Sequence, residues 1–300
     1  MKALVLGSLN TDFVYRLDHI VKNGETISAN TINTFPGGKG LNQSVALAKA
    51  GVDVYHAGLI GKDGEFLLKF LRENSVNTKF IDIIEEKTGH AIIQVDTNGE
   101  NSILLYGGAN KKITSKYIDY VLSNFGEGDF LILQNEINKI NEIIEKAYER
   151  KMTIVFNPAP MEENVKNISF SKLDYLILNE TELKTLSNEN DIEKGKEFLK
   201  LNFPNLNVIL TLGSKGSIYI NEEREIKQEI YKVDAVDTTA AGDTFIGFFV
   251  AGLIKNYELK KSLSLASAAA AISVTFKGAA TSIPTIIDAE KFLREYKGDY

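Results

Sequence analysis

Short, continuous apolar runs alternate with helix-length segments along most of this 300-residue chain, and this alternation limits its fold more than any other feature. Runs without polar interruption are typical of parallel strands that are covered on both faces. The predicted strands are Ala3–Gly7, Val54–Ile60, Phe130–Gln134, Thr153–Asn157, Tyr175–Asn179, Val208–Leu212 and Ser217–Ile220. The predicted helices between them are Leu41–Ala50, Glu65–Asn74, Asn138–Arg150 and Ile192–Leu201. The alternation predicts an α/β fold with a central, mostly parallel sheet.

Two regions break this rhythm, residues 11–36 and 88–106, because their apolar and polar residues alternate. Asn98-Gly99 is a strong signal for a hairpin turn, and Asn23-Gly24 marks a second turn. Strands of this kind are covered on one face only, so we expect a small separate sheet that leans on the main one. An antiparallel edge of the main sheet is the alternative. We expect one domain over residues 1–300 that includes this excursion.

The composition argues against several classes of protein. A net charge of −6 argues against a dedicated binder of nucleic acid or of anionic membranes. No segment reaches the roughly 18 apolar residues of a membrane-spanning helix. The absence of cysteine rules out disulfides, thiolate metal ligands and a cysteine nucleophile, and the three histidines are too far apart in the sequence to suggest a metal site. We expect a cytoplasmic protein.

Two glycine-rich segments precede predicted helices. In residues 36–43, glycines permit a tight turn and close approach of a ligand, and the free N–H groups of the following helix suit an oxygen-rich ligand. Lys39 and Asn42 could reach back to that ligand. Ordinary turn and cap glycines are the alternative.

The second segment, residues 235–245, leads into a helix that is apolar all round and is therefore expected to be buried. Its small side chains leave backbone N–H groups open to a phosphate, which predicts an anion hole with Asp243 beside it as a general base. The alternative is that Asp243 is the N-cap of this helix.

A third glycine-rich turn, residues 211–216, joins two predicted strands and either packs against a nucleotide or is only a turn. The sequence lacks G-x-x-x-x-G-K-[ST], a strand-to-helix G-x-G-x-x-G and G-x-S-x-G. These absences argue against a P-loop, a dinucleotide-binding domain and a serine hydrolase.

Taken together, these segments resemble the PfkB family of carbohydrate kinases. The resemblance covers about residues 3–295 and runs in the family's order through residues 7–12, 37–43, 107–110, 157–160, 179–182, 211–216, 237–245 and 277–279. The segment at 37–43, with Asn10 and Asp12, favours the D-ribose kinases of the family. The resemblance implies a three-layer α/β/α ribokinase-like fold, with a small β-sheet lid over the sugar and a homodimer formed through that lid.

The implied reaction transfers a phosphoryl group from ATP, with Mg²⁺, to the 5-hydroxyl of D-ribose, which gives D-ribose 5-phosphate and ADP. Asp243 would accept the hydroxyl proton, and the N–H groups of Ala240, Ala241 and Gly242 would stabilise the transferring phosphoryl group. The implied sugar ligands, besides Asp243, are Asn10, Asp12, Gly38, Lys39, Asn42 and Glu136. The implied ATP ligands are Asn179, Thr211, Leu212, Gly213, Ser214, Lys215, Gly216 and Gly242, with Glu182 near Mg²⁺.

The resemblance also implies a K⁺ ion beside the anion hole, which would raise the rate by ordering residues 237–243. The matching positions are Asp237, Thr239, Ser273, Phe276, Gly278 and Ser282, four of which would bind through main-chain oxygens. Hard oxygen ligands suit such an ion.

Two positions depart from the family pattern. Ser267 stands where many of these kinases have a histidine near the adenine. His90 lies on the expected lid, where a small or apolar residue is usual, so it either alters sugar selectivity or lies on the lid surface. Three alternatives remain: a kinase for 2-deoxyribose, fructose or a nucleoside, a non-catalytic sugar-binding module, and an NAD-type binding domain.

Overall fold

The computed structural model describes residues 1–298, so the last two residues of the expected domain lie outside the described part. Its main sheet is formed by β1 (Ala3–Leu6), β4 (Val54–Gly61), β5 (Asn77–Ile84), β8 (Phe130–Gln134), β9 (Thr153–Asn157), β10 (Tyr175–Asn179), β11 (Asn207–Thr211), β12 (Ser217–Ile220) and β13 (Glu225–Gln228). The order is β13-β12-β11-β10-β9-β8-β1-β4-β5. All pairs from β11 to β5 are parallel, and β12 and β13 are antiparallel additions at one edge. The mostly parallel sheet is therefore confirmed, and the analysis of apolar runs missed only its two edge strands.

Helices cover both faces of this sheet. One face carries α1 (Lys39–Lys49), α2 (Glu65–Glu73), α7 (Ala241–Ile254), α8 (Leu259–Ser273) and α9 (Ile286–Gly298), and the other carries α3 (Ser115–Leu122), α4 (Ile140–Glu149), α5 (Glu180–Ser187) and α6 (Ile192–Asn202). Short 3-10 turns lie at Lys62–Gly64, Gly108–Lys111, Glu163–Asn167, Phe170–Lys172, Gly213–Lys215 and Ala280–Ser282. Leu4 and Leu6 enter the core on one face, whereas Val5 enters the core on the other. Two cores explain why the strands are apolar without interruption.

Close packing of α7 fixes the position of the residues at its N-terminus. A Cβ atom on Gly247 would lie 2.3 Å from the Cβ of Ala46 in α1, and one on Gly252 would lie 2.4 Å from the Oγ of Ser262 in α8. Both contacts require glycine, because any side chain would push the helices apart. Helix α7 is thus wedged between α1 and α8, and its first turn faces the first turns of α1.

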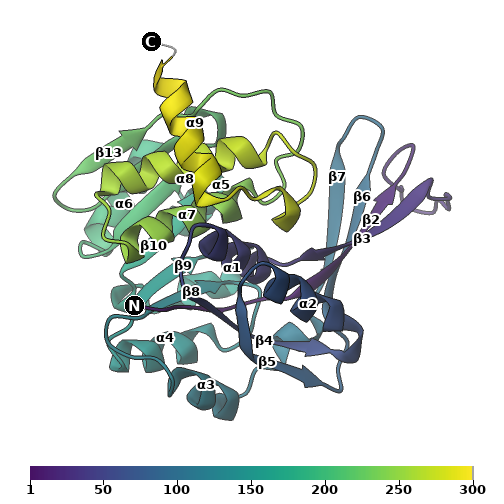
Figure 1. Ribbon diagram of the computed structural model, residues 1–300, viewed down its shortest axis with the longest axis horizontal. Coiled ribbons are helices and arrows are strands. Elements are labelled where there is room, and N and C mark those ends of the chain that lie inside the picture. Colours follow the sequence, from purple (N-terminus) through teal and green to yellow (C-terminus); the bar gives the residue numbers. More distant parts are fainter. Residues whose placement is uncertain (299–300) are drawn as a thin grey trace.

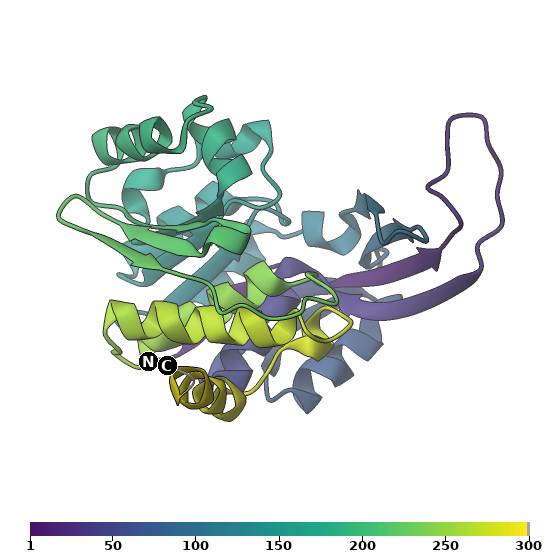
Figure 2. The same ribbon diagram turned by 90° about the horizontal axis from the view of Figure 1, so that it is seen from above.

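The smaller sheet comprises β2 (Asn10–Arg16), β3 (Thr31–Gly37), β6 (Gly89–Val95) and β7 (Asn101–Tyr106), in the order β3-β2-β6-β7. It projects from the body of the molecule (Figures 1 and 2). Because it is separate from the main sheet, the alternative of an antiparallel edge is wrong. Asn98-Gly99 joins β6 to β7 as expected, whereas Asn23-Gly24 lies within a longer loop between β2 and β3.

Among residues 1–298, no helix combines the length and the apolar character that crossing a bilayer requires.

Candidate active site

Asp243 lies in the first turn of α7 and is held from α1. Its Oδ2 accepts a hydrogen bond from Asn42 Nδ2 at 2.9 Å, and its Oδ1 accepts one from Gln43 Nε2 at 2.9 Å. The side chain is buried, with 7% of its surface exposed. Ala240 occupies the N-cap position, in a left-handed conformation with φ 59°. The N-cap alternative for Asp243 is therefore wrong, and its carboxylate is oriented by a neighbouring helix instead.

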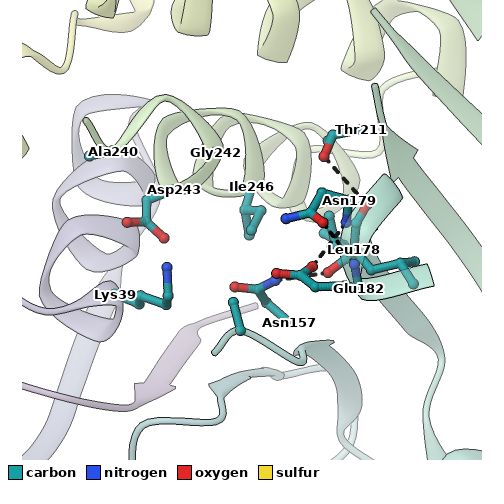
Figure 3. Close-up of a pocket in the computed structure, with 12 residues that line it drawn as sticks. Lys39, Asn157, Leu178, Asn179, Glu182, Thr211, Ala240, Gly242, Asp243 and Ile246 are labelled. Atoms are coloured by element: carbon teal, nitrogen blue, oxygen red, sulfur yellow. Dashed lines mark hydrogen bonds between the residues drawn. The ribbon is translucent and has the colours of Figure 1, made fainter. Parts of the chain in front are cut away.

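The N-terminus of α7 opens on a cavity of about 150 Å³. Gly242 is exposed there, and nothing lies within 4 Å of the place where its Cβ would stand. Of the three expected anion-hole donors, the N–H of Ala241 already donates to the carbonyl of Thr238 at 3.2 Å. Lys39 reaches the cavity from α1 with its amine directed toward Asp243 (Figure 3). A positively polarised helix end and a lysine at one cavity suit an anion.

A second group of polar side chains gathers where β2 and the start of α1 meet the end of β8. Asn10 is buried and accepts a hydrogen bond through Oδ1 from Asn110 Nδ2 at 2.7 Å. Glu136 accepts one from the backbone N–H of Lys39 at 3.0 Å and another from the hydroxyl of Ser8. The structure thus brings most of the expected sugar ligands to one place, and hydrogen bonds hold several of them before any ligand is present.

Two details of this group favour a hydroxyl-rich ligand. The Oδ1 atom of Asn42 is buried and has no partner in the described chain, and a buried acceptor of this kind is satisfied when a ligand donates to it. The carboxyl group of Asp12 lies directly over Gly37, where a Cβ would come within 2.0 to 2.4 Å of it. Gly38 follows with φ 95°, a conformation that favours glycine and turns the chain into α1.

The charges in this region shift each other's pKa values. Burial, and then the negative charges of Glu136 and Asp243, raise the pKa of Asp12 to about 7. The Asp243 carboxylate raises the pKa of Lys39, although burial opposes it. Burial also raises the pKa of Glu182 despite hydrogen bonds from Asn179. Such perturbed groups, concentrated around one cavity, are typical of a functional site.

A larger cavity of about 690 Å³ adjoins the first and shares Asn179, Thr211 and Gly242 with it. The expected nucleotide residues Gly213, Ser214 and Gly216 line it. Its remaining walls are mostly apolar and comprise Ile230, Tyr231, Lys232, Val233, Ala235, Thr238, Ala241, Phe245, Ser267, Ala270, Ala271 and Val274. A roomy, mostly apolar cavity beside an anion-binding helix end suits a nucleoside phosphate.

Two expected nucleotide residues lie elsewhere. Leu212 packs against the hydrophobic core, and Lys215 forms an ion pair with Glu180 at 3.3 Å.

The two positions that depart from the family pattern, Ser267 and His90, lie in different parts of the structure. Ser267 lines the larger cavity. His90 pairs with Thr11 and Tyr106, so its ring lies on the opposite face of the smaller sheet from Asp12, which is evidence against an effect on sugar selectivity.

The carboxylate of Asp237 links two of the segments expected to bind K⁺. It accepts hydrogen bonds from the N–H of Thr239 at 2.9 Å and from the N–H of Gly278 at 3.0 Å. Burial opposes ionisation of Asp237, but a hydrogen bond from the Thr239 hydroxyl, together with these two, lowers its pKa. The backbone N–H of Asp237 donates to the carbonyl of Val274, which belongs to the segment that carries the remaining expected ligands Ser273, Phe276 and Ser282. The six positions thus belong to two neighbouring segments.

The described residues hold no ready-made cluster of side chains for a divalent metal. Within residues 1–298, no three histidine, aspartate or glutamate side chains are grouped so that they could hold a metal ion. Glu182, which forms a capping box with Asn179 at the start of α5, lines the smaller cavity together with Asp243. These two carboxylates suit an ion that a phosphate ligand brings with it.

Four side chains that organise the site were not predicted from the sequence. Ser8 donates to Glu136, Asn110 donates to Asn10, Gln43 donates to Asp243, and Gln134 donates to Gln43. A role for Gln134 at the site could have been predicted from the sequence. The strands β8, β9, β10 and β11 are apolar runs that each end on a polar residue, namely Gln134, Asn157, Asn179 and Thr211, and ligands bind at the carboxyl ends of parallel strands.

Comparisons with known proteins agree with this geometry. A profile described as "pfkB family carbohydrate kinase" matches residues 1–286. A ribokinase from Staphylococcus aureus is 34% identical over 297 residues, which cover 95% of this chain and 97% of the relative. The crystal structure of a ribokinase from Thermotoga maritima aligns with a TM-score of 0.88 at 37% identity, over 98% of this chain and 99% of that one. The structure of an Arabidopsis thaliana ribokinase complexed with ribose and ATP aligns with a TM-score of 0.87 at 31% identity, over 98% of both chains.

Proposed function

Because the chain belongs to the pfkB family of carbohydrate kinases, we propose that it transfers the γ-phosphoryl group of ATP to the 5-hydroxyl of D-ribose. The products are D-ribose 5-phosphate and ADP. Similarity to a ribokinase that binds ribose and ATP supports this choice. The observation that carries it is the position of Asp243, a buried carboxylate that bonds to Asn42 and lines the smaller cavity, which adjoins the nucleotide-sized one.

The polar group binds the sugar. Asn10, Asp12 and Glu136 supply acceptors for ribose hydroxyls, Lys39 supplies a donor, and the unpartnered Oδ1 of Asn42 accepts another hydroxyl proton. Bonds to Asn110 and Ser8 hold two of these groups in place, so little ordering is required when the sugar binds. Gly38 contributes by close approach of its backbone, as the resemblance implied.

Phosphoryl transfer then relies on alignment and charge stabilisation. The 5-hydroxyl oxygen of the sugar forms a bond to the γ-phosphorus while Asp243 accepts the hydroxyl proton. At the same time, the bond between that phosphorus and the β,γ-bridging oxygen breaks. The N–H groups of Ala240 and Gly242 face the transferring group at the helix end, and that of Ala241 joins them by giving up its long bond to Thr238. Asn179, Thr211, Gly213, Ser214 and Gly216 surround the rest of the nucleotide.

Two metal ions fit the residues present. Glu182 would help to hold the Mg²⁺ that arrives with ATP, and the ion would neutralise phosphate charge. K⁺ would be held by Asp237, Thr239, Ser273, Phe276, Gly278 and Ser282, four of them through main-chain oxygens, because Asp237 already joins the two segments that carry these positions. This chain's own contribution there is to hold residues 237–243, and with them the helix end, in one conformation.

We further propose that the smaller sheet is a lid over the sugar and that a second copy of the chain covers it. Four consecutive residues of β7 are about half exposed or more, namely Ile103, Leu104, Leu105 and Tyr106 at 54%, 66%, 49% and 48%. Light scattering should give twice the mass of one chain. A monomer at all concentrations would contradict the dimer but not the reaction. Since the reaction consumes ATP, we place the enzyme in the cytoplasm.

A sugar panel tests the proposed function most directly. The purified protein is assayed with ATP and D-ribose, 2-deoxyribose, fructose or a nucleoside, with K⁺ or with tetramethylammonium as the monovalent cation. D-Ribose should give the highest kcat/KM, and K⁺ should raise the rate. A higher kcat/KM for another sugar would assign the chain to a sister kinase, and binding without ATP turnover would identify a sugar-binding module. Equal rates with both cations would refute the K⁺ proposal.

A further inference from the structure

A buried side-chain relay leads from the main sheet to Asp243. Gln134, the last residue of β8, donates from Nε2 to Oε1 of Gln43 at 2.7 Å, and Gln43 donates from Nε2 to Oδ1 of Asp243 at 2.9 Å. Gln43 and Gln134 are both fully buried. Among the described residues, the lining of the two cavities includes neither of them. Because neither side chain has exposed surface, the pair lies behind the proposed base, and Gln43 is the member that touches it.

The hydrogen bonds dictate how the Gln43 amide is turned. A carboxylate only accepts, so the NH₂ group of Gln43 must face Asp243 and its carbonyl oxygen must face the opposite way. That oxygen requires a donor, which Gln134 supplies. The second proton of Gln43 Nε2 points to Asn157 Oδ1 at 3.4 Å, a longer contact.

Gln134 serves Gln43 at a cost to its own bonding. Its Oε1 atom is buried without a partner in the described chain and lies against Gly7, where a Cβ would stand 2.3 Å away. A buried acceptor without a partner is destabilising, and an apolar side chain would avoid it. Its hydrogen bond to Gln43 is therefore the feature that explains an amide at this position.

We infer that Gln43 and Gln134 are positioning residues that fix the rotation of the Asp243 carboxylate, an inference that rests on the proposed function. Asn42 holds one oxygen of Asp243 and Gln43 holds the other, so together they set the plane of the carboxylate. Proton transfer requires the base within about 0.5 Å and 10–20° of its productive geometry. Loss of the Gln43 donor should therefore lower kcat and leave substrate binding intact.

The first test replaces each glutamine of the relay in turn with methionine, an apolar side chain of similar length. Gln43→Met should lower kcat with D-ribose by about tenfold or more, with the KM values of ribose and ATP within about twofold of the wild type. Gln134→Met should lower kcat in the same direction by a smaller factor, because Gln43 keeps its donor but loses its orientation.

Ser44→Ala is the matched control. Ser44 neighbours Gln43 on α1, is equally buried, and bonds to His56 Nδ1 at 2.7 Å on the side away from Asp243. Its substitution removes one buried hydrogen bond from the same helix and should leave kcat unchanged. Equal losses of kcat in Ser44→Ala and Gln43→Met would show a structural effect and overturn the inference.

A double-mutant cycle separates the relay from other effects on the site. If Gln43 acts through Asp243, then Gln43→Met should cause no further loss of kcat in an Asp243→Asn background. Additive losses would overturn the inference, and so would an unchanged kcat in Gln43→Met. If thermal melting shows that Gln43→Met is unfolded, Gln134→Met is put through the same cycle with the same criteria. A wild-type protein without ribose phosphorylation would refute the proposed function instead.

Discussion

The sugar side and the nucleotide side of the site are built by different means. On the sugar side, buried polar side chains are linked by hydrogen bonds, such as Asn42 to Asp243 and Asn110 to Asn10. On the nucleotide side, a cavity of about 690 Å³ has mostly apolar walls and a backbone turn at Gly213–Gly216. Sugar hydroxyls require hydrogen-bond partners in defined directions. The nucleobase of ATP can instead be bound by an apolar cavity, and its phosphates by backbone N–H groups. Substitutions of polar side chains should therefore have larger effects on the sugar side.

The strongest test of this contrast is Asp243→Asn. An amide of the same shape cannot accept the hydroxyl proton as a carboxylate does, so kcat should fall by about 10³-fold. Steady-state kinetics with D-ribose and ATP measures the loss. The KM of ATP should change little and serves as a control. A kcat within tenfold of the wild type would remove Asp243 from the chemistry.

Asp12→Asn should have the next largest effect, because it weakens acceptance of two sugar hydroxyls. We expect kcat/KM for D-ribose to fall by about 10²-fold, and the loss for 2-deoxyribose to be smaller because that sugar lacks one hydroxyl. Competition between the two sugars measures the change in preference. Equal losses of kcat/KM for the two sugars would show that Asp12 does not contact the 2-hydroxyl group.

The pKa of Asp12, raised to about 7 in the free protein, adds a pH dependence to the same prediction. Sugar binding to the carboxylate competes with protonation, so kcat/KM for D-ribose should fall about tenfold from pH 8 to pH 6. A carboxyl pKa above its unfolded value means that the folded state binds the proton more tightly, and Asp12 therefore destabilises the fold increasingly as pH rises from about 4 to 7. Asp12→Asn should remove the kinetic dependence and raise the melting temperature more at pH 8 than at pH 5. Retention of both pH dependences in the variant would assign them to another group.

Asp237→Ala tests the border between the two sides. It removes the hydrogen bonds that tie Thr239 and Gly278 together, and residues 237–243 should become less ordered. We expect kcat to fall about tenfold, equivalent to about 1.4 kcal/mol in the barrier, and activation by K⁺ to disappear. Titration of K⁺ at saturating substrates measures both. Full K⁺ activation in this variant would place the ion elsewhere.

The same contrast explains what the sequence could and could not predict. The apolar strands were predicted to within one residue at each end, because burial on both faces leaves a continuous pattern. The edge strands β5 and β13 were missed, because partial exposure breaks that pattern. Asp243 and its neighbours were found through glycines and small residues that repeat a family motif. The supporting contacts of Gln134 and Asn110 were not, because they join residues 91 and 100 positions apart, and only the fold brings them together.

The smallest expected effect lies on the nucleotide side, at Ser267. Ser267 lines the larger cavity among Ala270, Ala271 and Val274, so one hydroxyl group is a small part of the surface that the base would contact. Ser267→Ala should therefore change the KM of ATP by less than about twofold and leave the KM of D-ribose unaltered, because an apolar slot holds a base by contact area more than by one hydrogen bond. Kinetics with ATP and GTP in parallel measures this and shows whether the hydroxyl selects the base. A tenfold rise in the KM of ATP would give the nucleotide side a directional contact as strong as those on the sugar side, and the contrast between the two sides would fail at this residue.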